Sequence, residues 1–75
     1  MQLYAKIKKS SKYFNQNRLA EMHGEFPFPV TIDPDKCYDR AGDDYPVQGG
    51  PGGQYRFADV NLFIKRSDGH PVKIS

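Results

Sequence analysis

The sequence predicts a single, mostly β domain over residues 1–75: a small antiparallel barrel or a bent sheet, with at most one short helix near residues 11–22. Three observations lead to this prediction. The chain has 75 residues, which is enough for only one small core. Short stretches of alternating or β-branched apolar residues recur along it. Turns rich in Gly and Pro separate these stretches, as in small all-β folds.

The first predicted element is a strand over residues 2–8. Leu3, Ala5 and Ile7 alternate there with polar or aromatic neighbours. This period of two is typical of a strand that buries one side. We therefore expect the three apolar residues to face the core and their neighbours to face away from it.

Residues 11–22 give a mixed signal. Ser10 or Ser11 can cap a helix, but Asn15 and Asn17 lower the helix propensity of the segment. A short helix and a long, ordered loop both fit this pattern. In either case Gly24 is expected to end the segment, because glycine is the common residue after a helix.

Residues 25–32 are aromatic and β-branched, but they include Pro27 and Pro29. Each proline lacks the N–H that a strand donates to its neighbour. The segment is therefore expected at a sheet edge or in an extended arm. Residues 33–44 are rich in Asp and also contain a proline and a glycine, which predicts a loop.

A cluster of glycines at residues 49–53 separates two short strands predicted over residues 45–48 and 55–57. Such a cluster favours a turn, because glycine adopts backbone conformations that other residues avoid. Residues 58–60 can make one tight turn before a further strand over residues 61–66. That strand is apolar on both faces, which indicates a central position in the sheet.

The dipeptide Asp68-Gly69 predicts a hairpin after that strand. A type I′ turn needs a positive φ at both central residues, and Asp followed by Gly tolerates this well. Val72 and Ile74 then continue the pattern as a last strand. The chain thus contains four to six short strands joined by tight turns.

Residues 45–64, YPVQGGPGGQYRFADVNLFI, resemble the second half of SH3-like barrels. The shared pattern is a strand, a glycine turn, a strand, one helical turn and a closing strand. The resemblance implies a small SH3-like antiparallel barrel, to which the Asp68-Gly69 hairpin adds a further strand. Separately, the opening residues MQLYAKI and the size of the chain resemble small proteins encoded by bacteriophages.

The charges are unevenly distributed. The formal net charge is +2, which permits a nucleic-acid partner without requiring one. Residues 1–23 carry five cations and one acid, whereas residues 24–46 carry six acids and two cations. The sequence therefore contains a basic arm and an acidic middle, and either can be the surface that meets a partner.

The composition also predicts where the protein works. Cys37 is the only cysteine, so no internal disulfide can form and a reducing compartment is expected. No apolar run approaches the roughly 18 residues of a membrane span, and the first residues lack the apolar stretch of a signal peptide. We expect a cytoplasmic protein without a membrane partner, in the host cytoplasm if it comes from a phage.

No pattern in the sequence predicts an enzyme. The glycine cluster at residues 49–53 is followed by a predicted strand, not by the Gly-Lys-Ser/Thr and helix of a phosphate-binding loop. Cys37, His23 and His70 lack the paired spacing of zinc ligands, and nothing places a base beside the thiol. We expect no catalytic residue, no cofactor and no small-molecule substrate.

A metal site is not expected either. Asp33 and Asp35 begin like a calcium-binding loop, in which alternate residues supply oxygen ligands. However, Cys37 stands where a third oxygen is needed and Tyr38 stands where the loop requires glycine. A solvated acidic loop is the preferred interpretation over a weak, irregular cation site.

The first functional hypothesis is a non-enzymatic protein-binding module. Five Asp between residues 33 and 44 attract a basic groove, and neighbouring aromatic residues can supply buried anchors. If the phage resemblance holds, the module is an inhibitor that occupies a host enzyme or a defence nuclease. The expected surface residues are Asp33, Asp35, Asp39, Asp43, Asp44, Tyr38, Tyr45, Phe26 and Phe28. For Phe26 and Phe28 the alternative is a flap that closes the barrel.

The second hypothesis is a small nucleic-acid-binding module. Near the N-terminus lysines alternate with aromatic residues, as in single-strand binders whose rings stack on bases and whose ammonium groups follow the phosphates. The ordinary alternative is the polar face of a strand whose lysines protect a sheet edge from pairing. The residues of this basic arm are Tyr4, Lys6, Lys8, Lys9 and Lys12.

Overall fold

The computed structural model describes residues 2–33, 35 and 45–75. The elements are β1 (Leu3–Ile7), α1 (Gln16–Met22), β2 (Phe28–Ile32), β3 (Pro46–Gly49), β4 (Gln54–Arg56), a 3₁₀ turn (Phe57–Asp59), β5 (Val60–Lys65) and β6 (Pro71–Lys73). The strands form one antiparallel sheet in the order β4-β3-β2-β1-β5-β6. The prediction of a mostly β domain with one short helix is confirmed.

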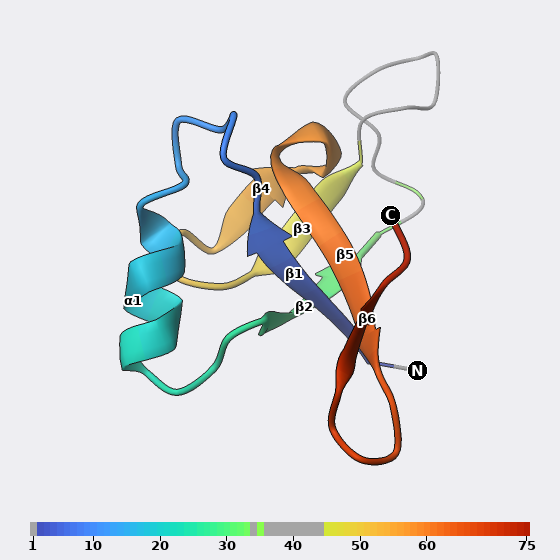
Figure 1. Ribbon diagram of the computed structural model, residues 1–75. Coiled ribbons are helices and arrows are strands. Elements are labelled where there is room, and N and C mark those ends of the chain that lie inside the picture. Colours follow the sequence, from blue (N-terminus) through green and yellow to red (C-terminus); the bar gives the residue numbers. More distant parts are fainter. Residues whose placement is uncertain (1, 34, 36–44) are drawn as a thin grey trace.

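The sheet is bent and open. Figure 1 shows β1, β5 and β6 in front of β3 and β4, with α1 standing beside them. In the strand order β4 and β6 are the two ends, and no pairing among the described strands joins them. The structure is therefore the bent-sheet form of the predicted fold and not the closed barrel.

Side chains from both halves of the bent sheet meet in one core. Ala5 of β1 pairs with Leu62 of β5 on one side and with Phe28 of β2 on the other, so these three side chains share one side of the sheet. We call this side the inner face. Ala20 of α1 packs against it. The buried residues of the inner face are Ala5, Ile7, Phe28, Val30, Val47, Tyr55, Val60 and Leu62.

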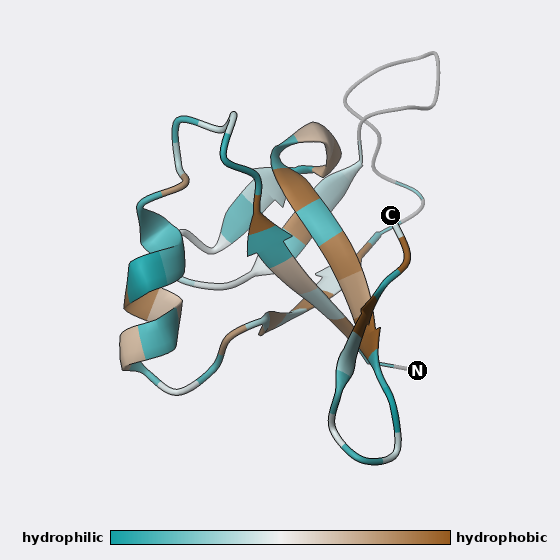
Figure 2. Cartoon of the chain, viewed as in Figure 1, coloured by the Kyte–Doolittle hydropathy of each residue, from teal (hydrophilic) through white to brown (hydrophobic). Residues whose placement is uncertain are grey.

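Hydropathy follows this arrangement. Figure 2 shows that β5 is mainly hydrophobic, whereas the loop from β5 to β6 is hydrophilic. β5 lies between β1 and β6, so the prediction that this strand is not at an edge is confirmed. The alternation in β1 is confirmed as well, because Ala5 and Ile7 are buried and Leu3 packs against the core.

Asn17 joins α1 to the end of β1. Its Oδ1 accepts a hydrogen bond from the N–H of Ile7, and its Nδ2 donates one to the carbonyl of Ile7, both at 2.9 Å. The side chain is buried, with 8% exposure. The residue that lowers helix propensity thus anchors the helix. Ser11 does not cap α1; its Oγ accepts the N–H of Tyr13 in the preceding turn.

β2 lies inside the sheet, so the prediction that residues 25–32 form an edge or an arm is wrong. The prolines are tolerated because they stand at the start of the strand. Pro27 precedes β2, and the pairing with β3 begins at Val30, one residue after Pro29. A missing N–H does little harm where a strand begins.

Both predicted hairpins are present, but the second uses a different turn. The Gly49–Gly53 turn joins β3 to β4 as predicted. Between β5 and β6, the N–H of Arg66 donates to the carbonyl of His70 at 2.9 Å, and the N–H of Gly69 donates to Arg66 at 2.8 Å. Gly69 has φ of 86°, whereas no described residue other than glycine has a positive φ. Asp68 therefore does not make a type I′ turn, and the loop has three residues with glycine last.

Candidate functional site

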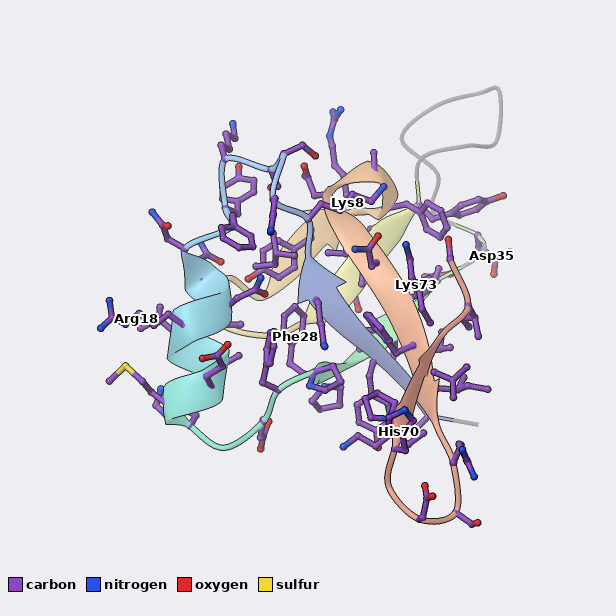
Figure 3. All side chains as sticks on the ribbon, viewed as in Figure 1. Lys8, Arg18, Phe28, Asp35, His70 and Lys73 are labelled. Carbon is purple, nitrogen blue, oxygen red and sulfur yellow. The ribbon has the colours of Figure 1, made fainter. Side chains whose placement is uncertain are left out.

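The side of the sheet opposite the inner face is built from alternate residues of β1, β5 and β6. Tyr4 pairs with Phe63, Lys6 pairs with Asn61, and Phe63 pairs in turn with Lys73. Paired residues project to the same side of a sheet. We call this side the outer face; its residues on the three strands include Tyr4, Lys6, Asn61, Phe63, Lys65 and Lys73. Figure 3 labels Lys73 on β6.

Lysine ammonium groups lie over the aromatic rings of the outer face. Lys65 Nζ is 4.2 Å from the centroid of the Tyr4 ring. Lys6 Nζ is 5.0 Å from the centroid of the Phe63 ring and 5.2 Å from that of Phe26. These distances fall within the ~6 Å at which a cation is attracted to the face of a ring. Two lysines thus cover three rings.

The outer face is also positively charged. None of the described strand residues that project to this side of β1, β5 and β6 is a carboxylate. Lys65 and Lys73 are exposed, and Lys6 is half-buried between its two rings. On the described residues of these three strands, aromatic rings and ammonium groups therefore lie side by side without a carboxylate between them, an arrangement that single-strand binders also use.

The structure divides the predicted basic arm between two places. Tyr4 and Lys6 lie on the outer face, and Lys8 follows them directly after β1. Lys9 is exposed in the next turn. Lys12 lies apart from these residues, with its Nζ 5.1 Å from the centroid of the neighbouring Tyr13 ring. The alternative of an ordinary polar strand face stays open, but its suggestion that these lysines guard a sheet edge is wrong for β1, which has β2 on one side and β5 on the other.

Sequence reasoning missed most of the outer face, since only Tyr4 and Lys6 of its named residues were predicted. Phe63, Lys65 and Lys73 were not assigned to any site, and Phe26 was assigned to a different one. Phe63 and Lys65 alternate with buried or half-buried neighbours in a strand that is apolar on both faces, so the signal was present. What the sequence does not contain is the register that brings this strand beside β1.

A hollow of about 700 Å³ lies where the 3₁₀ turn, β4 and the turn after β1 meet. The residues lining it are Ser10, Lys12, Tyr13, Gln54, Tyr55, Arg56 and Asp59. The Tyr55 hydroxyl accepts the N–H of Gly52 at 2.8 Å and donates to Oε1 of Gln16. Burial raises the pKa of Tyr55, and the Gly52 hydrogen bond opposes this rise. Tyr55 is thus a fixed wall of the hollow, and the Tyr13 ring meets its ring edge-on at 6.1 Å between centroids.

Four residues of the predicted acidic and aromatic surface lie outside the described residues, namely Tyr38, Asp39, Asp43 and Asp44. Asp33 is half-buried, and its Oδ1 accepts the N–H of Asp35 at 2.9 Å; Asp35 itself is exposed. Tyr45 is half-buried, and its carbonyl accepts the N–H of Phe57. The proposed role of this surface therefore stays a prediction.

Phe28 is wrong as a residue of an exposed binding surface. Its exposure is 1%, and its ring packs in the core with a centroid 5.8 Å from that of Tyr55. In a fully extended segment Phe26 and Phe28 would point the same way, because alternate residues share a side. β2 begins only at Phe28, so the alternation does not reach Phe26, which is half-buried at the border of the core beneath Lys6.

The described ranges contain neither a metal-binding cluster nor a membrane-spanning helix. No group of three or more His, Cys, Asp or Glu side chains there is arranged to hold a metal ion. No helix in the same ranges has the length and apolar character needed to cross a membrane.

Comparison with known proteins gives no match: no family model, no curated protein and no solved structure is similar to this chain. The resemblances to SH3-like barrels and to small phage proteins therefore stay predictions. The candidate function rests on the geometry of the outer face.

Proposed function

We propose that this chain is a non-enzymatic module that binds single-stranded nucleic acid on its outer face. The observation that supports the proposal most directly is the placement of Lys6 and Lys65 over the Phe63 and Tyr4 rings. It unites residues that are distant in the sequence into one cationic and aromatic surface. The proposal keeps the hypothesis of a nucleic-acid module but moves its centre from the basic arm to the paired strands.

The energies of the two contacts favour exchange of a lysine for a base. A cation–π contact at an exposed site contributes about 0.5–1 kcal/mol, whereas a base stacked on an aromatic side chain contributes about 1–3 kcal/mol. An ammonium group that leaves a ring can also pair with a phosphate. Binding of a nucleic-acid strand would therefore place a base on each ring in place of the lysine, and the lysine would move to a phosphate of the strand.

This exchange requires unpaired bases. In a duplex the faces of the bases are stacked on one another and cannot reach Tyr4 or Phe63 without being unstacked. Duplex binding by the same surface would use the lysines alone. We therefore expect a single-stranded oligonucleotide to bind more tightly than a duplex of the same sequence.

The test is fluorescence anisotropy of a labelled oligonucleotide at several salt concentrations. On single strands the slope of log affinity against log salt is about −0.7 for each phosphate contact. Lys6→Gln and Lys65→Gln should each make the slope less negative by about 0.7. Arg18→Gln removes the same charge from the exposed surface of α1 and is the matched control. Slopes in both lysine variants that equal that of the parent would contradict the proposal.

A protein partner is the second candidate function. Leu19 and Met22 lie three residues apart on α1 with exposures of 47% and 75%. Exposed apolar side chains that lie together are common at protein interfaces. The predicted acidic and aromatic surface, and the role of an inhibitor of a host enzyme or defence nuclease, belong to this candidate.

A pull-down from lysate with and without nuclease treatment separates the two candidates. A partner that stays bound after nuclease treatment and is lost in a Leu19→Ser, Met22→Ser variant supports a protein interface. Loss of all bound material on nuclease treatment supports the nucleic-acid candidate. Replacing Asp43 and Asp44 with Asn tests whether the acidic segment contributes to a retained protein complex.

A further inference from the structure

We infer that the hollow lined by Tyr13 and Lys12 is a second nucleotide site, which holds a base of the same single strand that binds the outer face. This inference rests on the proposed function. It adds a site in a different part of the fold, between the turn after β1 and strand β4.

The hollow lies at the end of the β1–β5 ladder, where the outer face ends. β1 and β5 stay paired up to Ile7 and Val60, and the N–H of Lys8 then donates to the carbonyl of Asp59 at 2.8 Å. Asp59 is also one of the residues that line the hollow. A nucleic-acid strand that follows the β1–β5 ladder therefore passes Lys8 and reaches the hollow. Figure 3 shows Lys8 at this end of β1.

The distance suits a short oligonucleotide. From Tyr4 to Lys8 the chain advances by four residues, which at about 3.3 Å each spans about 13 Å. A few nucleotides cover this length, and a longer strand must continue beyond it. Single-strand sites in small β domains extend over about 4–16 nucleotides, so a site that goes past the ladder is of ordinary size.

The hollow has the chemistry of a base site. Its volume of about 700 Å³ lies within the range of pockets that hold small ligands. Tyr13 is 36% exposed, and Lys12 Nζ lies 5.1 Å from the centroid of its ring, as lysines lie over the rings of the outer face. The same exchange applies here: Lys12 can move to a phosphate while a base takes its place on Tyr13. Ser10 and Gln54 line the hollow with further hydrogen-bonding groups.

The Asp59 carboxylate determines which end of a nucleotide faces it. A carboxylate repels phosphate but accepts a hydrogen bond from an exocyclic amino group, such as N4 of cytosine. The base, and not the phosphate, is therefore expected beside Asp59. Cytosine should be preferred to thymine, which presents no amino group.

The experiment compares a tetramer and an octamer of deoxycytidine in binding to the parent and to two Tyr13 variants. Tyr13→Leu keeps an apolar side chain but removes the ring, and Tyr13→Phe keeps the ring as the matched control. We expect Tyr13→Leu to weaken binding of the octamer about tenfold, equal to about 1.4 kcal/mol. Binding of the tetramer, which the outer face holds, should change less than twofold. Thermal melting confirms that both variants are folded.

The outcomes separate the inference from the function on which it rests. An octamer that binds Tyr13→Leu as tightly as the parent, while Lys6→Gln still weakens both oligomers, overturns the second site and leaves the outer face in place. If Lys6→Gln and Lys65→Gln each bind the tetramer and the octamer as tightly as the parent does, both proposals are overturned. Tetramer and octamer weakened equally by Tyr13→Leu would place Tyr13 in the main site and also overturn the inference.

The base preference gives an independent measurement. The parent should bind the deoxycytidine octamer more tightly than the thymidine octamer, and Asp59→Ala should remove this difference. Because removal of the carboxylate strengthens binding of both octamers, the ratio of the two affinities is the quantity to compare. A ratio of one in the parent would contradict the placement of a base beside Asp59.

Discussion

The two faces of the β1–β5 ladder come from alternate residues of the same two strands but are stabilised in different ways. On the inner face Ala5 and Leu62 are buried against β2 and α1. On the outer face Tyr4 and Phe63 carry lysines over their rings and stay in contact with solvent. Burial of apolar area provides most of the free energy of folding, whereas exposed cation–π contacts contribute little. The inner face therefore holds the fold, and the outer face can carry a function.

The largest expected effect is on the core, in a matched pair of phenylalanines. Phe28→Ala should lower the free energy of unfolding by about 3–5 kcal/mol, because it leaves a cavity at a fully buried site. Phe63→Ala, on the half-buried outer face, should lower it by less than about 2 kcal/mol. Urea unfolding measures both values. Equal losses in the two variants would show that the faces do not differ as described.

The next prediction compares two asparagines: Asn17 of α1, the helix that packs on the inner face, and Asn61 on the outer face. Asn17→Ala should cost about 2–4 kcal/mol, because it leaves the N–H and the carbonyl of Ile7 without their buried partner. Asn61→Ala, on the outer face, should change stability by less than about 0.5 kcal/mol. Thermal melts followed by circular dichroism give the difference. A larger loss in the Asn61 variant would reverse the comparison.

A smaller effect shows how far the inner packing extends into a turn. A Cβ added at Gly50 would lie 2.6 Å from the Phe28 ring, whereas one added at Gly53 would meet nothing within 4 Å. Both residues have a positive φ, so both substitutions by alanine carry the same backbone strain of about 1 kcal/mol. Gly50→Ala should cost a further 1–3 kcal/mol or so from overpacking. If chemical unfolding gives the same stability for Gly50→Ala and Gly53→Ala, the turn can shift without disturbing the core.

The smallest effect is the response of the inner face to alkaline pH. Burial raises the pKa of Tyr55 above its ordinary value of 10.0, so the folded state keeps a proton that the unfolded state loses. Unfolding therefore becomes easier as the pH rises above 10. Tyr55→Phe should show a weaker decline of stability over that interval. A decline as steep as that of the parent would assign the alkaline response to other groups.

Local patterns in the sequence were enough to predict most of the strands, while a helix and a loop both stayed open for residues 11–22. Alternation identified β1 and its buried side, and glycines identified both hairpins. The turn type at Asp68 was wrong because a hairpin with a three-residue loop uses the same dipeptide with only Gly69 at positive φ. The position of β2 was wrong because a proline at the start of a strand does not interrupt pairing farther along it.

The candidate site was harder to predict because it depends on pairing between distant strands. Tyr4 and Lys6 were selected from the sequence, and the structure places both on the outer face. Their neighbours Phe63 and Lys65 belong to β5, and nothing within β5 indicates that its partner is β1. The difference in burial between Phe28 and Phe26 was also hard to predict. It depends on where β2 begins and not on the composition of the segment.

The strand order also determines when the domain can assemble. β1 lies between β2 and β5, so the pairing of Tyr4 with Phe63 can form only after Phe63, which lies late in this sequence, has been synthesised. During synthesis the β2, β3 and β4 segments can pair with their neighbours as they emerge, while one side of β1 stays open. Contacts between such distant residues cost chain entropy before they form, and they slow folding. An incomplete chain that lacks β5 would therefore carry Tyr4 and Lys6 without their neighbours Phe63 and Lys65, and so without the surface proposed to bind nucleic acid.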